Sequence, residues 1–196
     1  VEEITNEWER VDPFMLYWAP WAWDINDGFV IERHKLTRED LQALIGVPGY
    51  NDDAIRTVLN EFTGGGLKEW LWADAQKARA EGKNTTYAVI TDDLVDAVQL
   101  WDSVPGKDLR EWGMSEKEIP DPSLSYSCEV WLIGTTVIRA VLNYDPLGRK
   151  PYYVTSYENV PGSVAGKGVA DLCRDSQNMV NAAARSLANN MGISSG

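Results

Sequence analysis

The sequence has few of the residues on which most catalytic and metal sites depend. Among 196 residues there is one histidine, His34, and there are two cysteines, Cys128 and Cys173. A zinc hydrolase or deaminase needs several His and Cys ligands at defined spacing, and a disulfide framework needs more cysteines. We therefore expect no metal, no cofactor and no enzymatic activity. We expect His34 to be a partly exposed strand residue and both cysteines to be small buried thiols.

Basic residues are also scarce, and no long apolar run exists. The chain has 18 Lys and Arg against 30 Asp and Glu, a net charge of −12. Tight binding to nucleic acid needs clustered Lys and Arg, so the charge argues against it, although DNA could slide past such a surface without sticking. A membrane span would need about 18 consecutive apolar residues. The start, VEEITNEWER, is acidic, is unlike a signal peptide and lacks an initiator Met, which predicts part of a longer protein.

The first half of the chain alternates strand and helix patterns. The run FVIERHKL, residues 29–36, alternates with a period of two and predicts a strand. Thr37 and Asp40 form the pattern of a capping box, so a short helix should follow and end near Gly46. A second helix is predicted after Asn51 and a third over residues 67–82. The apolar face of the second helix consists of Ile55, Val58, Leu59 and Phe62.

The second half predicts an antiparallel meander and a long helix. The apolar residues of 94–112 fit neither the helix period nor the strand period well, and Pro105-Gly106 favours a hairpin. The runs SCEVWLI, TTVIRAVLN and KPYYVTSY predict three strands. Residues 168–191 have one apolar stripe and an amide-rich opposite face. The fold class is therefore α+β: antiparallel hairpins, several short helices and one long C-terminal helix, with an α+β domain over 1–165 and the helix over 166–196. The stripe consists of Val169, Leu172, Cys173, Val180, Ala184, Leu187 and Met191.

The glycine-rich segment PGSVAGKG, residues 161–168, superficially suggests a phosphate-binding loop. In a Walker loop four residues separate the two glycines, but Gly162 and Gly166 enclose three, and Gly168 stands where a hydroxyl should bind magnesium. As a dinucleotide fingerprint the segment would place Asp171 beside a pyrophosphate, which it would repel. The pattern instead favours a flexible turn between the sheet and the helix.

Nine tryptophans and one acidic pair leave further interpretations open. Trp18, Trp21 and Trp23 lie in a proline-bearing loop, where they could stack on sugars as in a carbohydrate-binding module. The favoured interpretation is instead that they anchor the loop on the core or pack at a subunit contact, where Trp is enriched. Asp92-Asp93 is more typical of the start of a turn or helix than of a glycosidase site.

The order of these segments resembles the portal proteins of tailed bacteriophages, particularly those of short-tailed phages and related prophages. The resemblance rests on GFVIERHKLTREDLQALIGVPGYNDDAIRTVL and on VWLIGTTVIRAVLNYDPLGRKPYYVTSYENVPGSVAGKGVADLCRDSQNMVNAAARSLANNMGI. It covers most of the chain and is strongest over residues 126–191. Two departures are visible: Asn143-Tyr144-Asp145-Pro146 replaces a commoner Asn-Pro-x-Pro, and Ala165 stands where a bulky aromatic is frequent. The Gly-x-Gly turn of the family corresponds here to Gly166 and Gly168. Its Asp-x-Gln pair and the Asn, Arg and Asn that follow in the helix correspond to Asp175, Gln177, Asn181, Arg185 and Asn189.

The resemblance implies a homo-oligomeric ring, of twelve copies in most such proteins, at one vertex of a capsid. DNA is packaged through the ring by the terminase motor and later leaves through it into the tail. The chain would supply most of the wing and a helix leading towards the stem, without clip or crown. Expected partners are the terminase, capsid or scaffold proteins, tail adaptors and double-stranded DNA that passes without sequence-specific binding. The expected localisation is the virion, and the host cytoplasm during assembly, with no membrane.

The resemblance also suggests roles for the turn and the long helix. Gly166 and Gly168 would be required because the chain turns sharply from sheet to helix, through positive φ or close backbone approach. One face of the helix would contact the next subunit or line the channel. This candidate face consists of Arg174, Gln177, Asn181, Arg185 and Asn189.

Overall fold

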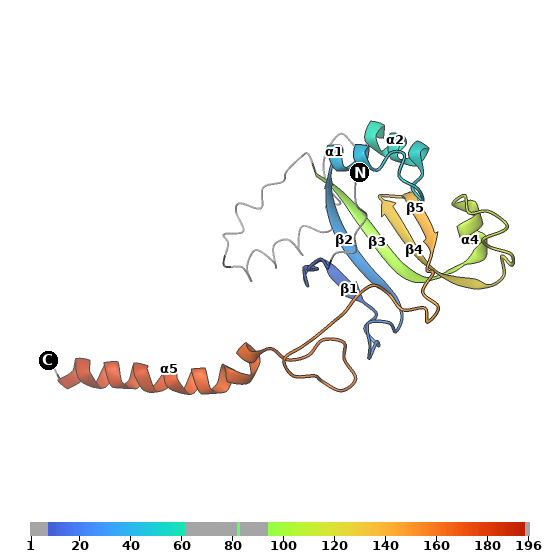
Figure 1. The fold of residues 1–196 in the computed structure, drawn as a ribbon. Coiled ribbons are helices and arrows are strands. Elements are labelled where there is room, and N and C mark those ends of the chain that lie inside the picture. The colour runs from blue at the N-terminus through green and yellow to red at the C-terminus, as the bar shows by residue number, and fades with distance from the viewer. Residues whose placement is uncertain (1–7, 62–81, 83–93, 195–196) are drawn as a thin grey trace. The chain divides into compact units, whose positions relative to one another are not determined.

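The computed structural model describes residues 8–61, 82 and 94–194, which form parts of two compact units (Figure 1). The first unit, here called the sheet unit, comprises Val1–Pro20 and Gly28–Lys150. The second, the helix unit, comprises Trp21–Asp27 and Pro151–Gly196. The boundary that we placed between residues 165 and 166 therefore lies inside the helix unit. The two units are described separately below.

The sheet unit contains a five-stranded antiparallel sheet with strand order β1-β2-β3-β4-β5. Each strand pairs with the strand that follows it in sequence, so the sheet is a simple meander. Together with the helices it confirms the α+β class. The strands are β1 (Leu16–Trp18), β2 (Val30–Thr37), β3 (Leu94–Pro105), β4 (Ser125–Ile133) and β5 (Thr136–Leu142).

Two short helices follow β2 and confirm the predictions made for them. In α1 (Arg38–Ala43), the Thr37 side chain accepts from the Asp40 N–H, and the Asp40 carboxylate accepts from the Thr37 N–H. This reciprocal capping box satisfies two backbone donors that a helix start would otherwise leave unpaired. In α2 (Asp52–Glu61), Ile55 and Val58 are buried as expected.

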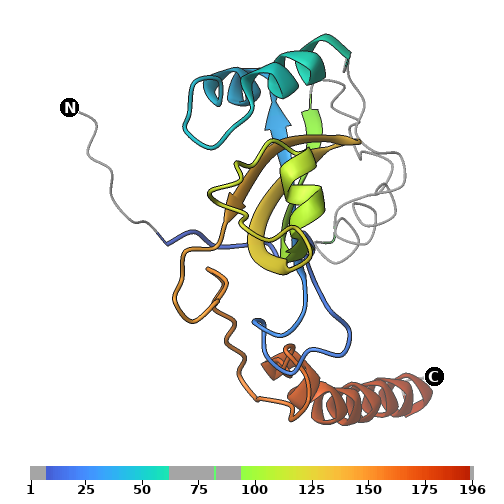
Figure 2. The same ribbon diagram turned by 90° about the vertical axis from the view of Figure 1, so that its right-hand side faces the viewer.

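Each face of the sheet has its own apolar core. Along β4, Cys128 and Val130 point into one core and Ile133 into the other, as the period of two requires. The first core is closed by α4 (Gly106–Glu111), which Figure 2 shows lying across the sheet. The second lies under α1 and α2 and includes Leu41, Ile55, Val58, Val95, Ala97, Ile133 and Ile138.

The predicted hairpin over residues 94–112 is wrong. Leu94–Pro105 is one long strand that pairs with β2 on one side and β4 on the other, and Gly106 begins α4. A central strand that contributes to cores on both faces mixes apolar residues at both parities, which obscures its period. Gly106 permits close packing here, because an added Cβ would lie only 2.8 Å from Ile119 Cγ2.

Two further expectations also need correction. Residues 150–157 form no strand; they run from the end of the sheet unit into the helix unit as irregular structure, followed by an isolated bridge between Glu158 and Lys167. Cys128 is buried, and this burial raises the pKa of its thiol to about 12. Cys173, however, is exposed. The expectation of two buried thiols therefore holds for Cys128 alone.

The long helix α5 (Val169–Ser194) confirms the element predicted over residues 168–191. No helix in the part of the chain that the structure describes is long and apolar enough to cross a membrane. The helix predicted over residues 67–82 falls, except for Gly82, outside the described residues. Phe62 and the Asp92-Asp93 pair also lie outside them.

Candidate functional site

The turn that leads into α5 is closed by a backbone bridge. Glu158 N–H donates to the Lys167 carbonyl at 3.2 Å, and Lys167 N–H donates to the Glu158 carbonyl at 2.8 Å. Gly166 lies directly against this bridge, where an added Cβ would overlap Ser156 and the Glu158 carbonyl. Gly166 is therefore needed for close backbone approach, as predicted, and Lys167 takes part in the bridge through its backbone.

Gly168 does not have the role that we expected for it. Its φ is not positive, and an added Cβ would meet no described atom within 4 Å. The glycine with positive φ in this segment is Gly162, at +82°. The steric demand of the turn thus falls on Gly162 and Gly166, and the expectation for Gly168 is wrong. The spacing of glycines could not distinguish these positions.

The two faces of α5 differ in chemistry, yet both are exposed. Every residue from Val169 to Ile193 is exposed, including the residues of the apolar stripe. Leu187 is 65% exposed and Val180 is 62% exposed, whereas leucine and valine are among the residue types most often buried. The helix therefore presents an apolar surface that the rest of the helix unit does not cover.

Another face of α5, next to the stripe, carries the predicted candidate residues, and two of them interact. Gln177 Nε2 donates to Asn181 Oδ1 at 3.2 Å, which links two amides one turn apart. Arg174 instead pairs with Asp171. The remaining candidates, Arg185 and Asn189, are also exposed. With compensating charges and short amides, this face is polar without a strong charge of either sign.

A second candidate surface is the loop of residues 21–27 in the helix unit. Trp21 is 68% exposed and Trp23 is 75% exposed, whereas Ala22 between them is buried. The expectation that these tryptophans anchor the loop on the core is therefore wrong for Trp21 and Trp23. Exposed indoles fit either a ligand or a subunit contact.

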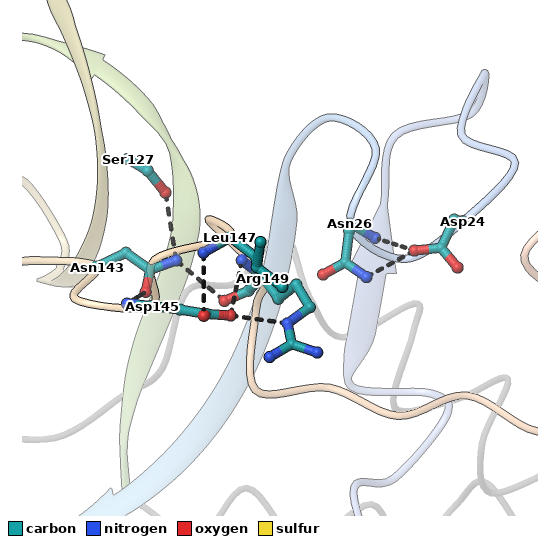
Figure 3. A network of polar contacts seen from close by, with 7 residues as sticks. All are labelled: Asp24, Asn26, Ser127, Asn143, Asp145, Leu147 and Arg149. Carbon is teal, nitrogen blue, oxygen red and sulfur yellow. Dashed lines mark hydrogen bonds and ion pairs between the residues drawn. The ribbon is translucent and has the colours of Figure 1, made fainter.

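Hydrogen bonds to two carboxylates hold this loop in shape. Asp27 Oδ2 accepts from the N–H groups of Trp23, at 3.2 Å, and Asp24, at 3.0 Å. Asp24 Oδ1 accepts from the backbone and side-chain amides of Asn26, at 2.9 and 2.7 Å (Figure 3). Sequence reasoning identified the tryptophans but missed these carboxylates, for which WDIND, a cluster of Asx-turn residues, was the available signal.

In the sheet unit, residues 143–149 form a tightly hydrogen-bonded turn. Asp145 accepts from the N–H groups of Leu147 and Arg149 and from the Arg149 side chain, while Asn143 Nδ2 donates to the Arg149 carbonyl (Figure 3). The Arg149 side chain first, and then these N–H groups, lower the pKa of Asp145. Asp145 thus stabilises the conformation of the turn.

His34 is part of a hydrogen-bonded row across the sheet. Its ring stacks on Trp131 with centroids 4.6 Å apart, and its Nε2 lies 3.0 Å from Gln99 Oε1. Gln99 Nε2 in turn donates to Glu129 at 2.9 Å. The ring face and one ring nitrogen of His34 are therefore both used in contacts within the sheet, and these contacts give the side chain a structural role. Among the described residues, no group of three or more His, Cys, Asp or Glu could hold a metal ion.

Comparison with known proteins adds no family to this picture: no protein-family model matches the chain, and no curated protein matches its sequence.

Proposed function

We propose that this chain is a structural subunit of a phage portal ring, forming part of the channel through which DNA is packaged and ejected. In this proposal it is not an enzyme, and it assembles with further copies of itself at the capsid vertex. The terminase motor, capsid or scaffold proteins and tail adaptors bind the assembled ring. The observation that carries the proposal is α5, in which every residue from Val169 to Ile193 is exposed.

The exposed stripe of α5 supports assembly because an isolated helix gains little from its own hydrogen bonds. Most helical stability in proteins comes from packing of an apolar face. Burying a leucine or valine side chain contributes about 1.5–3 kcal/mol. Leu172, Val180, Leu187 and Met191 all lie on the stripe and are at least 43% exposed. Contact with another subunit would recover this free energy.

The two different faces of α5 also suit a ring rather than a symmetric pair. A ring is built from heterologous contacts, in which one surface of each copy meets a different surface of the next. The helix has an apolar stripe and, next to it, an amide face that includes Gln177 and Asn181. Both faces could therefore be partly buried in a closed ring.

Charge supports a channel through which DNA moves. The chain carries a net charge of −12, so the phosphate backbone gains no counterion-release attraction over the chain as a whole. Within α5, Asp171 and Asp175 balance Arg174 and Arg185. A nearly neutral amide surface permits passage of DNA without sequence-specific binding.

Electron microscopy of the purified protein tests the proposal. We expect closed rings with a central hole, and monomers in this experiment would refute the ring. Gln177→Ala with Asn181→Ala sharpens the test, because buried amides left without partners cost about 1–3 kcal/mol at each interface. The double variant should leave subunit folding intact and lower ring yield in light scattering. Leu187→Asp serves as the comparison on the apolar stripe.

Carbohydrate binding is a second candidate, favoured by the exposure of Trp21 and Trp23. Indole faces held by a hydrogen-bonded loop could stack on sugar rings. A glycan array probed with the wild-type chain and with Trp21→Ala/Trp23→Ala tests this. Binding of a glycan by the wild type that the variant loses would support it.

A further inference from the structure

The loop of residues 21–27 has features of a binding surface, and they are independent of the proposed ring. Trp21 and Trp23 are exposed on either side of the buried Ala22. Hydrogen bonds to Asp24 and Asp27 hold the backbone that follows, so little freedom is lost when a ligand binds.

The hydrogen bonds inside the loop limit what it can offer a ligand. The N–H groups of Trp23, Asp24, Asn26 and Asp27 all donate within the loop. The Asn26 side-chain amide also donates to Asp24. What the loop offers in quantity is therefore acceptors, the carboxylate oxygens of two aspartates, together with indole ring faces.

The charge of the loop has one sign. WAWDIND contains two carboxylates and no Lys or Arg. An anionic ligand would be repelled, and the loop N–H groups that already donate within the loop leave fewer donors for the lone pairs of sugar hydroxyls. A guanidinium has five donors, no acceptor and a positive charge, and it stacks on aromatic faces more readily than the strongly hydrated ammonium of lysine.

We propose that the loop of residues 21–27 binds an arginine-rich segment of a partner protein, with guanidinium groups stacked on Trp21 and Trp23 and attracted by Asp24 and Asp27. The two indoles provide the stacking faces. The carboxylates provide acceptors and negative charge without leaving the loop structure that they hold. Specificity for arginine over lysine follows from the planar, weakly hydrated guanidinium.

Fluorescence anisotropy of a labelled hexa-arginine peptide tests this at about 150 mM salt, where long-range attraction is screened. We expect Trp21→Ala/Trp23→Ala to weaken binding about tenfold, since each exposed cation–π contact contributes about 0.5–1 kcal/mol. Trp21→Phe/Trp23→Phe should restore part of the affinity because it keeps aromatic faces. Hexa-lysine should bind the wild type more weakly than hexa-arginine.

Trp8→Ala is the matched control, because Trp8 is 80% exposed but lies outside the loop. It removes the same side chain without changing the charge and should leave affinity within about twofold. Equal affinity of wild type and Trp21→Ala/Trp23→Ala would overturn the inference, as would absence of hexa-arginine binding. Binding of maltohexaose through the same tryptophans, without hexa-arginine binding, would also overturn it and favour carbohydrate recognition. None of these results bears on ring formation, which electron microscopy tests separately.

Discussion

In the sheet unit, the large aliphatic side chains gather in two cores, and Leu41, Ile55 and Ile133 are fully buried. In α5, side chains of the same kind, such as Leu172 and Leu187, stay in contact with solvent. The two regions have similar apolar patterning, but only the sheet unit brings its patterned faces against one another. The sheet unit thus buries its apolar faces within itself, whereas in the proposed ring α5 would pack against another subunit.

The largest effect should follow from the buried ion pair of the sheet unit. Arg33 Nε and Nη2 donate to Asp96 Oδ1 at 3.0 and 2.8 Å, and both side chains are almost fully buried. Asp96→Ala removes the charge that neutralises Arg33, so the free energy of unfolding should fall by about 3–5 kcal/mol. Urea denaturation followed by circular dichroism measures it.

A paired replacement by apolar residues controls this prediction. Arg33→Met with Asp96→Leu removes both charges and should recover most of the lost stability. A shift of the unfolding midpoint by Asp96→Ala that is smaller than the shift from an ordinary surface substitution would contradict the prediction. The ion pair would then contribute nothing to the stability of the sheet unit. The large difference between the two regions would then rest on apolar packing alone.

Leucine truncation compares the two regions directly. Leu41→Ala removes a fully buried side chain and should cost about 2–5 kcal/mol. Leu187→Ala, at a side chain 65% exposed, should change the unfolding free energy of the subunit by less than about 0.5 kcal/mol. Chemical denaturation of both variants checks this at low protein concentration. A cost for Leu187→Ala as large as that for Leu41→Ala would show that α5 is already packed in the single chain.

Two glycines of the turn before α5 form the next comparison. Gly166→Ala should destabilise by about 1–3 kcal/mol, because its Cβ would overlap Ser156 and the Glu158 carbonyl. Gly168→Ala meets open space and should change stability by less than about 1 kcal/mol. Thermal melting of both variants tests the assignment, and a greater loss for Gly168→Ala would reverse it.

A smaller destabilisation is expected from loss of the capping box of α1 in the sheet unit. Thr37→Ala should cost about 1 kcal/mol. Hydrogen bonds from the Thr37 backbone and then its side chain lower the pKa of Asp40 below 3.8. Because the folded pKa is depressed, this contribution is present above pH 3.8 and is lost as the pH falls through the folded pKa. The free energy of unfolding, measured from pH 6 downward, should therefore depend less on pH in Asp40→Asn than in the wild type.

The local patterns of the sequence were enough to predict much of this fold. The alternation in residues 29–36, the Thr37–Asp40 capping box and the stripe of residues 168–191 each correspond to an observed element. These features depend on residues a few positions apart, which is the range over which helix periods and caps act. The two tryptophans of the candidate loop were likewise visible in the sequence.

Only the tertiary structure decided which of these surfaces are covered and which segments pair. Residues 94–105 became one central strand because β2 and β4 both pair with it, although their own period is ambiguous. The aromatic run of residues 150–157 has β-forming residues but pairs with no strand of the described chain. Cys173 and the stripe of α5 are exposed, and Gly166 rather than Gly168 is constrained by its neighbours. Pairing, burial and close approach depend on atoms distant in sequence, and residue spacing along the chain does not specify which atoms those are.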